Sequence, residues 1–184
     1  IIGHGETDKP GNVEPYFMEE FAKDLVEVLK LREISQAHWI GYSMGGRLAL
    51  FMAGTHTEYV KKVAVIGASP GIENSGERES RVKQDTNLAK KIEDDGIPEF
   101  IKFWEQLPLF ESQRHLPQST QKRIRAGRLM NTEIGLANSL RGMGTGQQPY
   151  VLDQLQQANK PILLLAGSKD QKFIEIAKSL EKSV

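Results

Sequence analysis

Gly-Tyr-Ser-Met-Gly at positions 41–45 is the part of the sequence best suited to chemistry. The pattern Gly-x-Ser-x-Gly serves catalysis when a strand precedes it and a helix follows, because the serine then lies on a tight turn with its hydroxyl exposed. Here an apolar run (37–40) precedes the pattern and a helix-forming run (47–53) follows it. We therefore predict that Ser43 is the reactive residue and that the backbone N–H of Met44 is an oxyanion-type donor. A chance pentapeptide at a strand-to-helix turn is the alternative.

The glycines of this pattern have a steric explanation. A tight turn brings neighbouring backbone close to the chain, so that a Cβ has no room. We expect this to hold at Gly41 and Gly45, and the additional glycine at position 46 strengthens the assignment of the turn.

Asp170 follows an apolar run (161–166) and the short loop 167–169. In the chain order serine, acid, histidine, the acid that orients a catalytic histidine comes from such a strand end. We predict that Asp170 is this acid. Asp170 is also a favourable N-cap for a helix that starts near Gln171, and the two roles are compatible.

The histidine that such a triad needs is missing from its expected place. No histidine follows Asp170, and all four histidines precede it: His4, His38, His56 and His115. A serine without a base is a poor nucleophile or proton acceptor, so we expect the chain as it is printed to be inactive. We interpret His4, within the turn Gly-His-Gly (3–5), as a structural residue.

Strands and helices alternate around these residues. An amphipathic helix is predicted over 17–30, because its apolar residues recur with helical spacing. Apolar runs at 37–41, 63–67 and 161–167 read as strands, and their continuity is typical of a parallel sheet covered on both faces. Together with the serine motif, the alternation predicts an α/β-hydrolase fold, with a parallel sheet and flanking helices.

The middle of the chain breaks this alternation. Rich in charged residues and glutamine, it shows helical stretches at about 77–95, 97–106, 117–130 and 133–140 but no convincing strand. We interpret it as a helical cap inserted between strands, above the carboxyl ends of the sheet. The predicted organisation is core (1–69), cap (70–158) and a return to the core with the acid (159–184). Because the chain starts in an apparent strand end and stops in an apparent helix, we expect a fragment that lacks both ends.

Composition excludes several classes of function. Lys+Arg and Asp+Glu both number 24, which gives a formal net charge of zero and no general attraction to nucleic acid. Cysteine is absent, so disulfides and thiolate chemistry are excluded, and this fits the reducing cytoplasm. Metal sites with cysteine ligands are excluded for the same reason. No run approaches the roughly 18 apolar residues of a membrane span.

Several longer motifs resemble one family. The sequence is similar to 2-succinyl-6-hydroxy-2,4-cyclohexadiene-1-carboxylate synthases of the menaquinone pathway over nearly its whole length. The motifs that carry the resemblance lie in order along the chain: Gly-His-Gly-Glu-Thr-Asp (3–8), Gly-Tyr-Ser-Met-Gly-Gly-Arg (41–47), Ala-Ser-Pro-Gly-Ile (68–72), Trp-Glu-Gln-Leu-Pro-Leu-Phe (104–110), Leu-Ala-Asn-Ser-Leu-Arg-Gly-Met-Gly-Thr-Gly (136–146) and Asp-Gln-Lys-Phe (170–173).

The resemblance implies a lyase that uses a Ser-His-Asp triad to remove a proton from a small polycarboxylate substrate, which then expels pyruvate. It implies no metal and no cofactor. Ser43 and Asp170 match the triad serine and acid. The residues that match substrate-binding positions, or flank the serine, are Tyr42, Met44, Arg47, Arg81, Trp104 and Arg128.

Arginine suits this role, because its planar guanidinium binds carboxylates in bidentate fashion. Arg47 follows Ser43 by about one helical turn, whereas Arg81 and Arg128 lie in a cap that is charged throughout. Trp104 is also suited to anchoring the cap. Two alternatives remain open: a carboxylesterase or thioesterase with the same triad, and a non-catalytic ligand-binding protein that keeps the fold. The sequence does not determine the oligomeric state.

Overall fold

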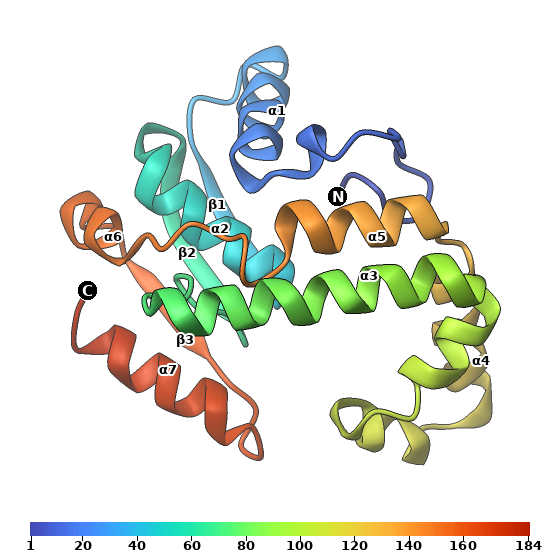
Figure 1. Cartoon of the computed structure of the whole chain (residues 1–184). Helices are drawn as coiled ribbons and strands as arrows, with labels where there is room; N and C mark the ends of the chain where they lie inside the picture. The colour runs from blue at the N-terminus through green and yellow to red at the C-terminus, as the bar shows by residue number, and fades with distance from the viewer. The chain divides into compact units, whose positions relative to one another are not determined.

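A computed structural model describes all 184 residues, which form two compact units. One unit contains the sheet and comprises residues 18–79 and 145–184. The other is helical and comprises residues 1–17 and 80–144. We call them the sheet unit and the helical unit (Figure 1). No helix in either unit is both long and apolar enough to cross a membrane.

Three parallel strands form the sheet, in the order β1-β2-β3. They are β1 (Ala37–Tyr42), β2 (Val60–Ile66) and β3 (Ile162–Leu165). Ile40 lies opposite Ala64, which in turn lies opposite Leu163. All three runs predicted as strands are therefore strands, and the predicted parallel pairing is confirmed.

Helices cover one face of this sheet. The helix α2 (Met44–Thr55) packs on β1 and β2, and every residue from Leu48 to Ala53 is buried. On α2 pack α1 (Met18–Leu31) and α6 (Leu152–Ala158), while α7 (Gln171–Glu181) contacts β3. A short 3₁₀ helix, Thr57–Tyr59, connects α2 to β2. The predicted helices over 17–30 and 47–53 correspond to α1 and α2.

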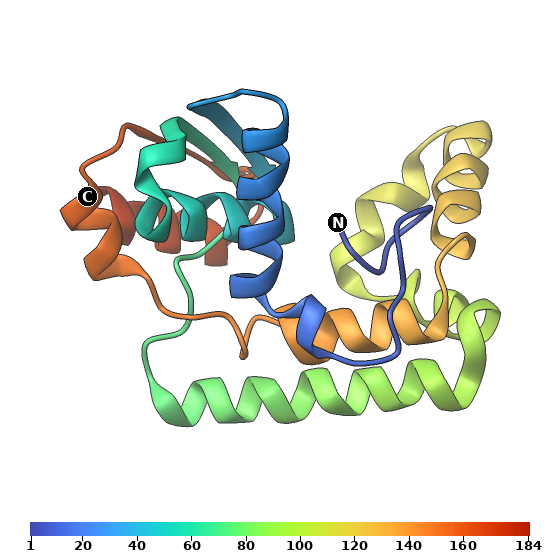
Figure 2. The ribbon, with the colours of Figure 1, turned by 90° about the horizontal axis from the view of Figure 1, so that it is seen from above.

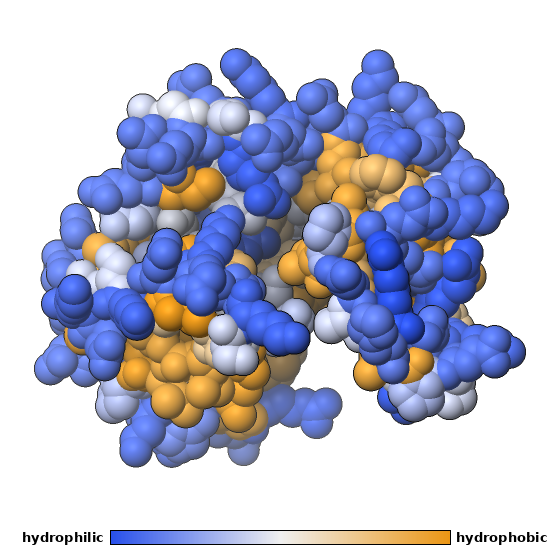
Figure 3. All heavy atoms as spheres, turned by 90° about the horizontal axis from the view of Figure 1, so that it is seen from below, coloured by the Kyte–Doolittle hydropathy of each residue, from blue (hydrophilic) through white to orange (hydrophobic).

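The other face of the sheet carries exposed apolar side chains in this structure. Its side chains include Ile40 (80% exposed), Tyr42 (72%), Leu163 (57%) and Leu165 (45%). The orange area at lower left in Figure 3 belongs to the sheet unit.

The helical unit contains most of α3 (Ser75–Trp104), as well as α4 (Gln118–Leu129) and α5 (Glu133–Met143). Two 3₁₀ helices, Glu14–Tyr16 and Pro108–His115, complete it. In Figures 1 and 2, α5 lies alongside α3. A buried cluster of Ile92, Ile97, Phe100 and Ile101 packs with Leu88, Trp104, Leu136 and Leu140.

A break divides α3 where the sequence predicted two helices. Gly96 has φ 75° and ψ 163°, which lie outside the helical range, and Pro98 follows it. The backbone N–H of Ile97 restarts the helix by donating to the Glu133 carboxylate at 3.1 Å. Glycine tolerates this positive φ, and proline suits the first turn of the new helix.

The two compact units are divided at other residues than 69 and 158, where the sequence predicted the boundaries between core and cap. Residues 1–17 belong to the helical unit, where a Cβ on Gly3 would lie 2.8 Å from the carbonyl oxygen of Gly135. Residues 70–79 and 145–158, including α6, belong to the sheet unit. These assignments depend on packing between distant segments.

Candidate active site

Ser43 lies on the turn between β1 and α2, as its motif predicts. Its side chain is exposed, and its backbone has φ 50° and ψ −114°. Non-glycine residues rarely adopt such a conformation, which costs on the order of 1–3 kcal/mol. Two backbone hydrogen bonds hold the turn: the Ser43 N–H donates to Ile66 at 2.9 Å, and the Ser43 carbonyl accepts from the N–H of Arg47 at 2.9 Å. The turn therefore presents the hydroxyl at the carboxyl edge of the sheet.

The glycines of the turn differ in what they allow. A Cβ on Gly41 would lie 2.5 Å from the backbone nitrogen of Gly46, and a Cβ on Gly46 would lie 2.7 Å from the Cβ of Ala68. A Cβ on Gly45 would meet nothing within 4 Å. The steric expectation thus holds at Gly41 but is wrong at Gly45, where the turn is open. Gly46 is the second constrained position, because α2 passes close to the loop after β2.

Asp170 lies beyond the carboxyl end of β3, at the same edge of the sheet as Ser43. Its carboxylate accepts a hydrogen bond from the backbone N–H of Phe173 at 3.3 Å, so it serves as the N-cap of α7. Because β2 separates β1 from β3, the two outer strands are about 10 Å apart. To connect Ser43 and Asp170 by hydrogen bonds, a side chain the size of imidazole would have to lie between them.

None of the four histidines is placed to fill that gap within the sheet unit. His38 is five residues before Ser43 on β1, a strand length of about 16 Å, and its side chain is exposed. His56 lies at the far end of α2, about 18 Å along the helix from Met44, and contacts the hydroxyl of Thr55. The remaining two, His4 and His115, belong to the helical unit.

His4 has a structural environment, in agreement with its interpretation as a turn residue. Its Nδ1 donates to the carbonyl of Ile2 at 3.1 Å, and its backbone N–H bonds to the hydroxyl of Thr7 at 3.1 Å. Burial lowers the pKa of the His4 imidazole below its usual value, because the charged form loses solvation. Burial therefore favours the neutral form of His4, whereas the hydrogen bond to Ile2 opposes this shift.

Tyr42 and Met44 flank Ser43, and only Met44 lies at the N-terminus of a helix. Met44 is the first residue of α2, where backbone N–H groups and the helix dipole favour negative charge. Tyr42 ends β1 and is 72% exposed, on the same side of that strand as Ile40. The N-terminus of α2 is thus the part of the turn that can stabilise a developing anion.

Arg47 is partly buried on α2, about one turn after Ser43. Its Nη1 donates to Oε1 of Gln148 at 3.2 Å. Gln148 is completely buried, and its Nε2 donates to the carbonyl of Ser69 at 3.0 Å. Sequence reasoning missed Gln148. A glutamine next to a proline carries no distinctive signal, and the quoted family motif at 136–146 stops two residues before it.

Arg81 and Trp104 lie in the helical unit, each with structural partners there. The Arg81 guanidinium donates to both carboxylate oxygens of Asp85, at 3.0 and 3.1 Å. Trp104 stacks on Phe100 with 5.6 Å between ring centroids, and lies 5.5 Å from the ring of Phe110. Trp104 therefore packs within the helical unit, which agrees with the structural role considered as an alternative to substrate binding.

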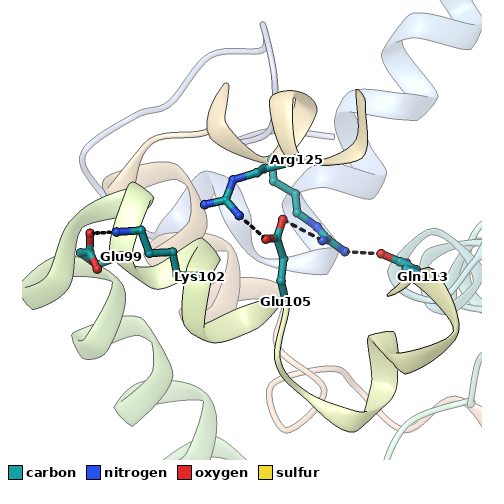
Figure 4. A network of polar contacts seen from close by, with 6 residues as sticks. Glu99, Lys102, Glu105, Gln113 and Arg125 are labelled. Carbon is teal, nitrogen blue, oxygen red and sulfur yellow. Dashed lines mark hydrogen bonds and ion pairs between the residues drawn. The ribbon is translucent and has the colours of Figure 1, made fainter. Parts of the chain in front are cut away.

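Arg128 has three partners within the helical unit. It bonds to Glu105 at 3.2 Å and to Gln113 at 2.9 Å, and its guanidinium lies 4.7 Å from the ring centre of Phe110. Glu105 also accepts from Arg125 at 2.7 Å (Figure 4). These residues line a cavity of about 330 Å³. Three arginines (Arg114, Arg125 and Arg128) and Lys122 surround it with only one carboxylate, so its wall is positively charged.

The structure gathers no group of three or more histidine, aspartate or glutamate side chains that would hold a metal ion. Ser43, Arg47 and Asp170 all belong to the sheet unit, and the first and last lie at one edge of the sheet. Arg81, Trp104 and Arg128 all belong to the helical unit.

Comparisons with known proteins agree with this geometry. The family model described as alpha/beta hydrolase fold matches residues 1–182. A Bacillus subtilis (strain 168) protein, which carries the name 2-succinyl-6-hydroxy-2,4-cyclohexadiene-1-carboxylate synthase provisionally, is 42% identical over 98% of this chain and 66% of its own length. The Photorhabdus laumondii enzyme of that name is 33% identical over 97% of this chain and 62% of its own length.

Among solved structures, MenH from S. aureus has a TM-score of 0.91 and 35% sequence identity, over 99% of this chain and 68% of that one. The chain thus spans about two thirds or less of the synthases named above. A serine on the strand-to-helix turn at the carboxyl edge of a parallel sheet, together with these matches, shows that the chain belongs to the α/β-hydrolase fold family, and within it to the group that includes MenH.

Proposed function

We propose that this chain carries the serine, the acid and an anion-binding arginine of a lyase in menaquinone biosynthesis. The reaction removes a proton from a polycarboxylate substrate and eliminates pyruvate, leaving 2-succinyl-6-hydroxy-2,4-cyclohexadiene-1-carboxylate. The observation that carries the proposal is the pairing of a strained, exposed Ser43 with Arg47 one turn along the same helix. The synthase name of the B. subtilis and P. laumondii relatives supplies the product, and the family resemblance implies the elimination that forms it.

The elimination balances without a cofactor. A base takes a proton from carbon, the C–H electron pair becomes a new C=C bond of the ring, and the C–O bond to the enolpyruvyl group breaks with its electrons on oxygen. The released enolpyruvate takes up a proton and becomes pyruvate. Ser43 takes part in the proton transfer through its histidine partner, and Asp170 orients that histidine. The N–H of Met44, at the N-terminus of α2, stabilises negative charge that develops on oxygen.

Arg47 binds a carboxylate of the substrate near the reacting carbon. Its guanidinium is partly buried, so its interaction with an anion is screened less by water than at an exposed site. An ester pocket for neutral substrates has little use for an arginine in this position. Arg47 therefore favours the lyase over a carboxylesterase or thioesterase.

The remaining matched residues, Tyr42, Arg81, Trp104 and Arg128, are proposed to bind substrate on the strength of the family resemblance. Each of the two arginines already pairs with a carboxylate, Asp85 or Glu105, which fixes its guanidinium but offsets its charge. A substrate carboxylate would have to share these guanidinium groups.

No histidine of the sheet unit is placed to serve as the base, so we propose that the 184-residue chain does not turn over by itself. The test compares this chain with the chain extended by the segments that the B. subtilis relative has beyond the match. Pyruvate release is expected only from the extended protein, and Ser43→Ala should abolish it. Near-normal turnover by the Ser43→Ala variant would refute the triad assignment. Hydrolysis of simple esters without pyruvate release would favour the hydrolase alternative.

Location and partners follow from the same proposal. We propose a cytoplasmic location, which fits the absence of cysteine, and a small polycarboxylate as the only partner, since a net charge of zero gives no general attraction to nucleic acid.

A further inference from the structure

Gln148 is the one completely buried polar side chain of the sheet unit, with an exposed fraction of 0%. It lies in the irregular segment between α5 and α6. Burying an amide without hydrogen-bond partners costs about 1–3 kcal/mol, so such a residue needs a specific environment. Both ends of the Gln148 amide are in fact hydrogen-bonded, its oxygen to Arg47 at 3.2 Å and its nitrogen to Ser69 at 3.0 Å.

The two hydrogen bonds use the amide of Gln148 both as an acceptor and as a donor. Oε1 accepts from a guanidinium, and Nε2 donates to a carbonyl. A glutamate in this position would place a carboxylate oxygen, which can only accept, against the Ser69 carbonyl. A methionine would supply no donor for that carbonyl and only a weak acceptor for Arg47. Asparagine has both a donor and an acceptor but is shorter by one methylene. The site therefore selects glutamine by chemistry and by length.

The surrounding backbone holds Gln148 in place. The N–H of Val151 donates to the carbonyl of Pro70 at 2.9 Å. A Cβ on Gly71 would lie 2.8 Å from the carbonyl oxygen of Pro149. The segment around Gln148 thus runs directly along the loop that follows β2, and Gln148 connects that loop to α2.

We propose that Gln148 is a positioning residue for Arg47. It fixes the guanidinium on the turn after Ser43, so that the guanidinium meets a substrate carboxylate in a defined orientation. Because Gln148 is neutral, it orients the guanidinium without contributing a negative charge, unlike Asp85 and Glu105 at the other two matched arginines. This inference rests on the proposed function, in which Arg47 binds a carboxylate.

Four variants test it in the active, extended protein: Gln148→Met, Gln148→Glu, Arg47→Ala and the double variant Arg47→Ala/Gln148→Met. Gln147→Met is the matched control, because Gln147 is the exposed neighbour of Gln148. A hydrogen bond to a charged group corresponds to roughly 10- to 100-fold in an equilibrium constant. We expect Gln148→Met to raise KM by that factor and to change kcat less. Gln148→Glu should also raise KM, because its carboxylate competes for Arg47.

The double variant separates positioning from a general structural role. If Gln148 acts through Arg47, Gln148→Met should raise KM no further once Arg47 is alanine. Additive increases would overturn the inference. If Arg47→Ala raises KM but Gln148→Met does not, the positioning role is wrong while the proposed function stands. If Arg47→Ala leaves KM and kcat unchanged, the binding role of Arg47 fails, and the inference fails with it.

A readout without turnover uses the 184-residue chain. The guanidinium N–H signals of Arg47 in an NMR spectrum, assigned through Arg47→Lys, should be restrained in the wild type and averaged in Gln148→Met. They should be unaffected in Gln147→Met. Identical Arg47 signals in the wild type and Gln148→Met would contradict the inference regardless of activity.

Discussion

Two neighbouring glycines of α2 give a matched test of the turn geometry. Gly45→Ala and Gly46→Ala make the same chemical change at adjacent helical positions. At Gly45 the new methyl meets nothing within 4 Å, whereas at Gly46 it lies 2.7 Å from the Cβ of Ala68. Carbon atoms pack best at about 3.5–4.0 Å, so the loop after β2 and α2 must separate by roughly 1 Å at this point.

The two substitutions should change the free energy of unfolding differently. Alanine is a better helix former than glycine by about 1 kcal/mol, so Gly45→Ala should stabilise the sheet unit by up to that amount. Gly46→Ala gains the same term but is overpacked at a cost of about 1–3 kcal/mol, so its net effect ranges from neutral to destabilising by ~2 kcal/mol. We therefore expect the two variants to differ by about 1–3 kcal/mol, or several degrees in Tm.

Tryptophan fluorescence during urea unfolding measures this difference in the sheet unit alone. The chain has two tryptophans, Trp39 on β1 and Trp104 in the helical unit. In a Trp104→Phe background, Trp39 reports on the sheet unit, where its indole N–H bonds to the carbonyl of Tyr59. Equal unfolding midpoints for Gly45→Ala and Gly46→Ala would refute the close approach of α2 to the loop.

Three further predictions concern single residues. Asp170→Asn should keep the hydrogen bond from the N–H of Phe173, whereas Asp170→Ala should lose about 1 kcal/mol of stability in urea unfolding. Both variants should impair pyruvate release, and unimpaired release by either would remove Asp170 from the triad. His4 is partly buried, and its lowered pKa means that the unfolded chain binds more protons than the folded chain as the pH falls from 6.5 through the folded pKa, so stability is lost over that range. His4→Asn should show a flatter profile of stability against pH between pH 7 and 5, and an identical profile would contradict the lowered pKa of His4. Arg47→Ala should weaken transition-state or substrate stabilisation by about 2–5 kcal/mol, measured as kcat/KM, and an unchanged value would exclude a paired carboxylate.

Local signals in the sequence predicted the parts of the fold that depend on neighbouring residues. Separate helices were predicted over 77–95 and 97–106, and the break in α3 lies between them, at Gly96. The turn at Ser43 was predicted because its flanking strand and helix are adjacent in the sequence. The parallel sheet followed from apolar runs of strand length separated by helices.

Packing between distant segments was not predictable in this way. The seven residues of α6 (Leu152–Ala158) were assigned to the cap, because nothing in so short a helix shows that it packs on α2. Residues 1–17 were assigned to the core, yet they pack in the helical unit through contacts such as that of Gly3 with Gly135. The expectation for Gly45 failed for a related reason: the motif does not show which glycine faces the loop after β2.

The candidate site was predictable where its residues are chemically distinctive. Ser43 and Asp170 lie at one edge of the sheet, as the parallel strands require. Gln148 was missed because its role depends on complete burial and on two hydrogen bonds to residues far away in the sequence. Partners of this kind become visible only in three dimensions.

The most direct test of the lyase assignment is pyruvate release measured in parallel for four proteins. They are the 184-residue chain and its version extended with the additional segments of the B. subtilis relative, each with and without Ser43→Ala. We predict pyruvate release by the extended protein alone, and its loss in the extended Ser43→Ala variant. Pyruvate release that survives Ser43→Ala, or a folded extended protein that hydrolyses esters but releases no pyruvate, would contradict the assignment.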